Sequence, residues 1–215
     1  MLKAFDIETM PNLDVIELLP EPALKLGNIK DPAKIEQKRE LAKREQIERM
    51  ALNPLFGRII CAAFYNGKKA AGHIIPKLND EMETKLIEWI FRHFQDGDRI
   101  MTWNGKGFDF DFLFKRAMIL GIDIRAFDLP PITAYIKRNS DIHIDLMVEW
   151  DWRNFMKLDT VAKILLGEGK DDIDFKDFPE LMTTKSGREK ILSYCITDTV
   201  RTFDVGVKMQ DFLFV

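Results

Sequence analysis

Residues 1–10 of the chain, MLKAFDIETM, place the carboxylates of Asp6 and Glu8 inside a short apolar run. The run predicts a buried strand, and side chains two positions apart on a strand point to the same face. Two like charges side by side on a core strand are costly unless a partner neutralises them, and a divalent cation with oxygen ligands is the usual partner. An isolated Asp-x-Glu is also common at strand ends where both carboxylates are solvated, so the choice depends on the rest of the chain.

The length and composition are those of a folded globular protein. The chain has 215 residues, of which 46% are hydrophobic, enough for the core of one sizeable domain. Its 32 basic and 35 acidic residues give a net charge of -3, so an anionic substrate has to be met by local basic patches or by metals. We recognise no leader peptide and no membrane-spanning run, and therefore expect a cytoplasmic protein without a membrane partner. Cys61 and Cys195 form no metal-type pair and no disulfide framework, which suits a reducing compartment.

The order of apolar patterns and turn signals predicts a mixed α/β fold. Strands are expected around residues 2–7, 58–65, 70–75, 99–103 and 143–147, and helices over residues 33–52, 81–94, 110–120, 158–166 and 188–209. This alternation favours helices that cover a mixed sheet. Residues 171–177 are acidic, which favours a surface loop.

The predicted helix over residues 33–52 is dense in charged side chains and has only a thin apolar stripe. Asp31 and Pro32 suit its N-cap and its first position. One interpretation is a solvated amphipathic helix along one edge of the fold. The alternative is a helix beside an active-site cleft, where nearby lysines could contact a phosphate backbone. These lysines are Lys25, Lys30, Lys34 and Lys38.

A second acidic site follows the predicted strand at residues 99–103. Residues 103–109, WNGKGFD, form a Gly-rich turn and place Asp109 in the first turn of a helix, where the helix dipole favours an anion. Asp109 could equally be a helix-stabilising acid, and Asp111 is a rival for any functional role. The turn lacks the Lys-Ser/Thr signature of a phosphate-binding P-loop.

A third acidic site lies in the predicted C-terminal helix. Tyr194 and Asp198 are four residues apart and therefore share a helix face, an arrangement that is often an ordinary surface pair. His143 is more often a structural histidine than a ligand in such a context. We find no cluster of His or Cys residues with the spacing of a zinc site.

The three acidic sites together resemble the motifs of the DEDD superfamily of 3′ to 5′ exonucleases. Residues 5–9 (FDIET) are similar to the first motif, residues 104–109 (NGKGFD) to the second and residues 194–198 (YCITD) to the third. Residues 158–167 (LDTVAKILLG) are similar to the segment before the third motif in the proofreading domains of family B DNA polymerases. The chain thus resembles the stand-alone predicted exonucleases that are related to the family B polymerase exonuclease domain.

This resemblance implies a ribonuclease H-like fold, with helices on both faces of a mixed central β-sheet, and a single 3′-5′ exonuclease domain over residues 1–215. It also implies two divalent cations, Mg²⁺ or Mn²⁺, held by four catalytic carboxylates beside a catalytic tyrosine. By position these residues are Asp6, Glu8, Asp109, Asp198 and Tyr194. The tyrosine belongs to the DEDDy branch, because the histidine branch requires His where Ser193 stands. The charged segment at about 25–52 is an insertion that the core fold does not explain.

The resemblance further implies hydrolysis at the 3′ end of a nucleic acid, with DNA favoured over RNA, single-stranded or frayed ends, and a separate polymerase or repair protein as a conceivable partner. The candidate substrate-binding residues are Thr9, Trp103, Asn104 and Phe108. Trp103, Phe108 and Phe5 could stack on bases or be core aromatics, and Asn104 could bind substrate or fix its turn. Two alternatives stay open: an RNA 3′-5′ exonuclease, and a non-catalytic nucleic-acid-binding or polymerase-accessory module on the same fold.

Overall fold

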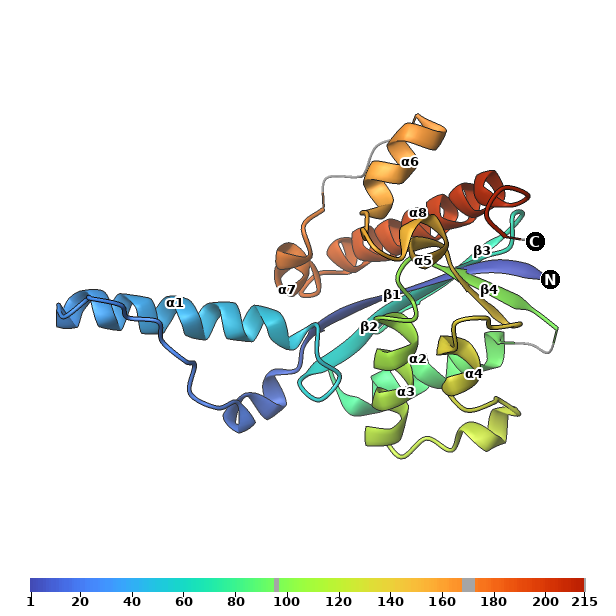
Figure 1. Cartoon of the computed structure of the whole chain (residues 1–215). Coiled ribbons are helices and arrows are strands. Elements are labelled where there is room, and N and C mark those ends of the chain that lie inside the picture. Colours follow the sequence, from blue (N-terminus) through green and yellow to red (C-terminus); the bar gives the residue numbers. More distant parts are fainter. Residues whose placement is uncertain (95–96, 168–172, 215) are drawn as a thin grey trace.

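The computed structural model describes residues 1–94, 97–167 and 173–214. Its centre is a five-stranded sheet with the order β3-β2-β1-β4-β5, shown in Figure 1. The strands are β1 (Leu2–Pro11), β2 (Gly57–Tyr65), β3 (Ala70–Ile74), β4 (Arg99–Thr102) and β5 (His143–Asp145). β1 pairs antiparallel with β2 and parallel with β4, and β4 pairs parallel with β5. The predicted α/β class and mixed sheet are therefore confirmed.

Helices lie on both faces of this sheet, with α8 across one face and α2 and α3 against the other (Figure 1). The α-helices are α1 (Pro32–Met50), α2 (Asp80–His93), α3 (Asp109–Ile119), α4 (Thr133–Ile136), α5 (Leu146–Asp151), α6 (Leu158–Leu166), α7 (Phe178–Leu181) and α8 (Lys185–Met209). Short 3-10 helices cover Leu13–Leu18 (η1), Ile124–Phe127 (η2) and Phe175–Asp177 (η3). No helix in the described ranges is long and apolar enough to cross a membrane.

Side chains of β1 alternate between the two faces. Phe5 packs into the larger hydrophobic cluster, where its ring stacks on Phe64 with the centroids 4.8 Å apart, whereas Ala4 packs into a second cluster with Val205 of α8. Because the strand has a period of two, Asp6 shares the α8 face with Ala4. Phe5 is 1% exposed, so it is a core aromatic and not a residue that could stack on bases.

Two glycines let α8 approach the sheet closely. A Cβ atom on Gly206 of α8 would lie 2.5 Å from Sδ of Met101 on β4, and one on Gly72 of β3 would lie 2.8 Å from Cδ1 of Leu192 on α8. Both distances are shorter than real Cβ contacts allow. Because glycine has no side chain at these two positions, α8 can approach the sheet closely.

Two predicted segments differ from the structure or lie partly outside its described ranges. The strand expected over residues 143–147 ends at Asp145, because the Asp145 side chain accepts a hydrogen bond from the backbone N–H of Met147 and caps α5. Of the acidic segment 171–177, residues 171 and 172 lie outside the described residues, and its C-terminal part forms η3.

Residues 12–56, which we call the arm, extend away from the sheet between β1 and β2 (Figure 1). The predicted helix within it is confirmed as α1, with the Asp31 side chain accepting from the backbone N–H of Ala33 at 3.0 Å and Pro32 in its first turn. Met50 is the one buried residue of α1, so most of the helix is solvated. Both ends of the arm are fixed where Pro11 pairs with Gly57 and the N–H of Asn12 donates to the carbonyl of Phe56.

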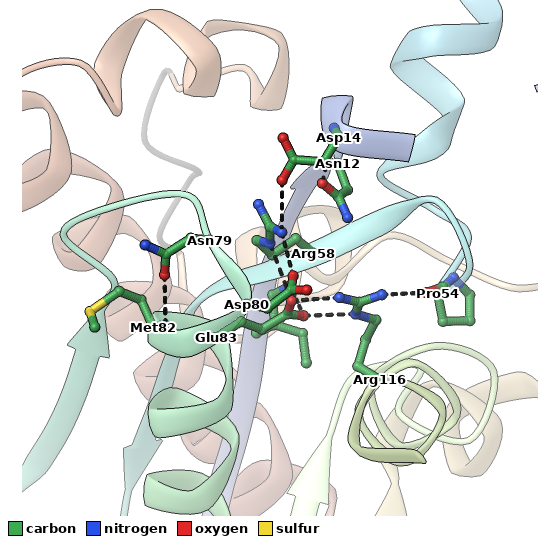
Figure 2. A network of polar contacts seen from close by, with 10 residues as sticks. Asn12, Asp14, Pro54, Arg58, Asn79, Asp80, Met82, Glu83 and Arg116 are labelled. Carbon is green, nitrogen blue, oxygen red and sulfur yellow. Dashed lines mark hydrogen bonds and ion pairs between the residues drawn. The ribbon is translucent and has the colours of Figure 1, made fainter. Parts of the chain in front are cut away.

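A buried ionic network joins β2, α2 and α3, and no pattern in the sequence predicted it (Figure 2). Glu83 is fully buried and accepts hydrogen bonds from Nε (2.8 Å) and Nη2 (2.6 Å) of Arg116 and from Nε of Arg58 (3.3 Å). The backbone N–H of Ile59 donates to the same carboxylate at 2.9 Å. Arg58 also binds Asp80 at 2.6 Å. These contacts lock the three elements together.

Candidate active site

The structure gathers the acidic residues of all three sequence motifs around Asp6. Burial raises the pKa of Asp6 well above its usual range, and the nearby charges of Glu8, Asp109 and Asp198 raise it further. The four carboxylates come from β1, the first turn of α3 and the middle of α8. Residues separated by almost the whole chain therefore meet at one place.

The donor set of this cluster fits divalent cations. Ligand atoms of Asp6, Glu8 and Cys195 all lie within 4.8 Å of one another. Four carboxylates repel one another at a buried position, and hard divalent cations with oxygen ligands relieve such repulsion. The sequence showed only that Cys195 has no metal-type cysteine pair, whereas its sulfur lies 3.8 Å from Oδ2 of Asp6.

Asp109 and its rival Asp111 have different surroundings. Asp109 is 2% exposed, and burial raises its pKa to about 7, although the backbone N–H groups of Asp109 and Ile7 favour its charged form. The Asp111 carboxylate forms an ion pair with Lys115 at 2.7 Å on the surface of α3. The helix thus directs Asp109, and not Asp111, toward Asp6.

Tyr194 and Asp198 lie on the same face of α8, as their spacing predicts. Burial raises the pKa of Tyr194 above its usual range, and the charges of Asp198, Glu8 and Asp6 and a hydrogen bond with Asp198 add to this. The phenol is therefore a neutral hydrogen-bond donor beside the carboxylates. Arg201, one turn further along α8, contacts Asp198 through Nη1 at 3.1 Å.

Asp145 is a residue of this region that sequence reasoning missed. Its carboxylate is fully buried and accepts hydrogen bonds from the backbone N–H groups of Asn104 (3.0 Å) and Lys106 (2.9 Å). It thereby holds the turn that precedes Asp109, in which Asn104 has a φ of 72°. The signal in the sequence was the type of residue, because Asp often caps a helix that follows a strand, as Asp145 does between β5 and α5.

Replacing Asp145 by Asn should loosen this turn, because the amide NH₂ would face backbone N–H donors. We expect the free energy of unfolding to fall by about 2 kcal/mol, the range for hydrogen bonds to charged groups. Asp123→Asn is the matched control, since Asp123 also caps a helix but is exposed. Urea denaturation measures both; equal losses in the two variants would contradict the role of Asp145.

The stability of the metal-free protein should fall as pH rises from about 4 to about 7. In this window Asp109, with a pKa raised from 3.8 to about 7, keeps its proton in the folded state after the unfolded chain has lost it. The folded state then binds more protons, and at most about 4 kcal/mol is lost above the window. Thermal unfolding in EDTA at pH 5 and pH 8 tests this. Asp109→Asn should reduce the pH dependence, Asp111→Asn should not, and a flat wild-type profile would refute it.

His143 is structural, as its isolation in the sequence suggested. Its Nδ1 hydrogen bonds the carbonyl of Tyr135 at 2.8 Å, and its Nε2 hydrogen bonds Oγ1 of Thr102 at 2.8 Å. Burial lowers its pKa to about 3, which keeps it neutral. Thr102 also accepts from the N–H of Gly105, so this chain of hydrogen bonds further fixes the turn before Asp109.

The candidate substrate-binding residues lie in different environments. Thr9 donates its hydroxyl to the carbonyl of Ala51 at 2.6 Å. Trp103 donates its Nε1–H to the carbonyl of Met156 at 2.9 Å. Phe108 packs against the larger hydrophobic cluster but is only half-buried. Asn104 fixes its own turn through its backbone, and a Cβ on Gly107 would lie 2.5 Å from Oδ1 of Asn104.

Known proteins resemble the chain in sequence and in structure. Residues 52–213 match a family described as predicted 3′-5′ exonucleases related to the exonuclease domain of PolB. The chain is 30% identical over 139 residues to DNA polymerase 1 of Pyrococcus abyssi, which covers 59% of the chain and 18% of that protein. It is 47% identical over 55 residues to the DNA polymerase catalytic subunit of Human herpesvirus 8 type P (isolate GK18), 25% of the chain and 5% of that protein.

The structure of the family B DNA polymerase from the hyperthermophilic archaeon Pyrobaculum calidifontis matches 97% of the chain and 24% of that polymerase, with a TM-score of 0.59 and 17% identity. This likeness agrees with the predicted fold, which is α/β and ribonuclease H-like. The chain spans a quarter or less of the length of each of these polymerases. Asp6 and Glu8 precede the residues that match the family.

Proposed function

Since this chain belongs to the family of predicted 3′-5′ exonucleases related to the exonuclease domain of PolB, we propose that it removes nucleotides from the 3′ end of a nucleic acid with the help of two divalent cations, Mg²⁺ or Mn²⁺. The observation that supports this best is the position of the half-buried Asp6 carboxylate, on which the charges of Glu8, Asp109 and Asp198 act together. A binding module would gain nothing from four mutually repelling acids. We also take residues 1–215 as one exonuclease domain with a charged insertion at about 25–52.

In this proposal Asp6, Glu8, Asp109 and Asp198 would hold the two ions, with Asp6 as the central ligand because the charges of the other three act on it. When bound, such ions generate a hydroxide nucleophile and neutralise charge on the phosphate and the leaving oxygen. Tyr194 orients the attacking water by a hydrogen bond. It is no general base, because its raised pKa keeps the phenol protonated.

We propose DNA as the substrate because the relatives that match the chain are DNA polymerases. We propose single-stranded or frayed 3′ ends, since a terminal nucleotide that is already unpaired can enter the site without the cost of breaking a base pair. Thr9, Trp103, Asn104 and Phe108 are the residues we propose to contact it. A cytoplasmic location and a polymerase or repair protein as partner belong to the same proposal.

The direct test is hydrolysis of single strands of DNA and RNA that carry a label at the 3′ or the 5′ end, with Mg²⁺, Mn²⁺ or EDTA. We expect a ladder that shortens from the 3′ end, only with metal, and faster on DNA. Faster hydrolysis of RNA would identify the RNA exonuclease alternative. Intact strands under every condition would instead favour the non-catalytic binding module.

A further inference from the structure

The segment between α5 and α6 is unusually exposed for its composition. Six consecutive exposed residues, 152–157, have the sequence WRNFMK and are called the 152–157 loop below. Trp152 is 62% exposed and Phe155 is 65% exposed. Large aromatic side chains in water are costly for a loop unless they serve to bind something.

The flanks of the loop are fixed although its side chains are exposed. Trp150 and Leu158, on either side of it, pack against the hydrophobic cluster that α8 shares with the sheet. The carbonyl of Met156 accepts a hydrogen bond from Nε1 of Trp103 at 2.9 Å. The loop is therefore held at a defined position against the end of β4.

That position lies beside the candidate active site. β1 and β4 run parallel, and their last paired residues are Ala4 and Met101. Asp6 lies two residues further along β1, and Trp103, one residue beyond the end of β4, directly precedes the turn that leads to Asp109. Trp103, which anchors the loop, packs in the same cluster as Val205 of α8, about two helical turns beyond Asp198.

The chemistry of the loop fits a single-stranded nucleic acid. Aromatic rings that alternate with cations offer stacking to bases and attraction to phosphates at once. The loop carries Arg153 and Lys157 and no acidic residue. The guanidinium of Arg153 lies 5.7 Å from the ring centroid of Trp152, and its contact with Asp151 is long, at 3.7 Å.

We propose that the 152–157 loop is a stacking surface for the bases of a single-stranded segment next to the 3′ end, with Trp152 and Phe155 against the bases and Arg153 and Lys157 against the backbone. The inference relies on the proposed function only for the polarity of the bound strand, with its 3′ end at the active site. The binding of the strand by the loop does not depend on that function. A protein partner is the other occupant to consider. The cations between the rings favour nucleic acid, because an apolar protein surface would leave them unpaired.

The test compares wild-type protein, the double variant Trp152→Ala/Phe155→Ala and the control Phe212→Ala, whose ring is 86% exposed after α8. Fluorescence anisotropy of a 5′-labelled single-stranded oligonucleotide in EDTA measures binding without hydrolysis. Stacking of one to two bases predicts binding about 10- to 100-fold weaker for the double variant and unchanged for Phe212→Ala. Lys157→Gln should make the slope of log K for binding against log salt concentration shallower, by about the amount that corresponds to one phosphate contact.

A kinetic comparison separates this inference from the proposed function. On a long single strand the double variant should raise KM and leave kcat unchanged, and on a dinucleotide, too short to reach the loop, it should match wild type. Equal affinity of the double variant and wild type would overturn the inference even if both cleave. No binding of single strands by wild type would also overturn it. Binding that depends on the loop, without hydrolysis by wild type, would uphold it and overturn only the proposed function.

Discussion

The Asp6→Asn variant is expected to lose nuclease activity by about 10³-fold or more while it keeps its fold. The charges of Glu8, Asp109 and Asp198 all act on the Asp6 carboxylate, so its removal should release both proposed cations. The loss of electrostatic stabilisation at the reacting phosphate is typically of this size. Circular dichroism checks the fold, and a metal-dependent hydrolysis assay checks the rate.

Asp111→Asn is the matched control, because it removes one acid near Asp109 whose charge is already paired with Lys115. Its hydrolysis rate should stay within about twofold of wild type, as expected for a surface ion pair. In EDTA, Asp6→Asn should melt at a higher temperature than wild type, since it removes a buried repelled charge. Mn²⁺ should stabilise wild type but not Asp6→Asn. A variant at Asp6 that retains the wild-type rate would refute our assignment of the site.

Replacing Glu83 by Ala should cause the largest loss of stability, about 3–5 kcal/mol in the free energy of unfolding. Arg58 and Arg116 are 4% and 2% exposed, and both bind the Glu83 carboxylate (Figure 2). Without it, two cations stay buried without their shared anion. Breaking a buried pair from one side is costly for this reason.

The control for this prediction is Glu81→Ala on the same helix. Glu81 pairs with Lys85, and both side chains are more than 60% exposed, so the loss of stability should be a small fraction of that in Glu83→Ala. Urea denaturation of the three proteins gives both values. Similar losses for Glu81→Ala and Glu83→Ala would show that solvent reaches the network and compensates the arginines.

The acidic residues were predictable because each motif depends on local spacing. Alternation along a strand places Asp6 and Glu8 on one face, and a four-residue step along a helix places Tyr194 under Asp198. Local spacing alone did not decide which acid of α3 turns inward, since Asp109 and Asp111 are both in the first turn, and only the resemblance to the second motif selected Asp109. The Asp145 carboxylate, at the end of β5, accepts hydrogen bonds from the turn between β4 and α3. This contact between segments distant in the sequence fixes the start of α3 and so orients Asp109.

The remaining features needed contacts between distant segments. Nothing in the local sequence distinguishes Glu83 from Glu81, because burial depends on the arginines that β2 and α3 bring to it. The strand expected over 143–147 was too long because the apolar residues Leu146 and Met147 suit a strand as well as a helix. The Asp145 carboxylate favours the helix, because it accepts a hydrogen bond from the backbone N–H of Met147 in the first turn.

The arm carries its helix far from the sheet. Helix α1 has 19 residues, which at 1.5 Å per residue gives a length of about 28 Å. The chain leaves β1 and enters β2 at the paired residues Pro11 and Gly57, and the hydroxyl of Thr9 on β1 donates to the carbonyl of Ala51 directly after α1. A partner bound along α1 would therefore lie within about 28 Å, measured along the helix, of the strand that carries Asp6 and Glu8.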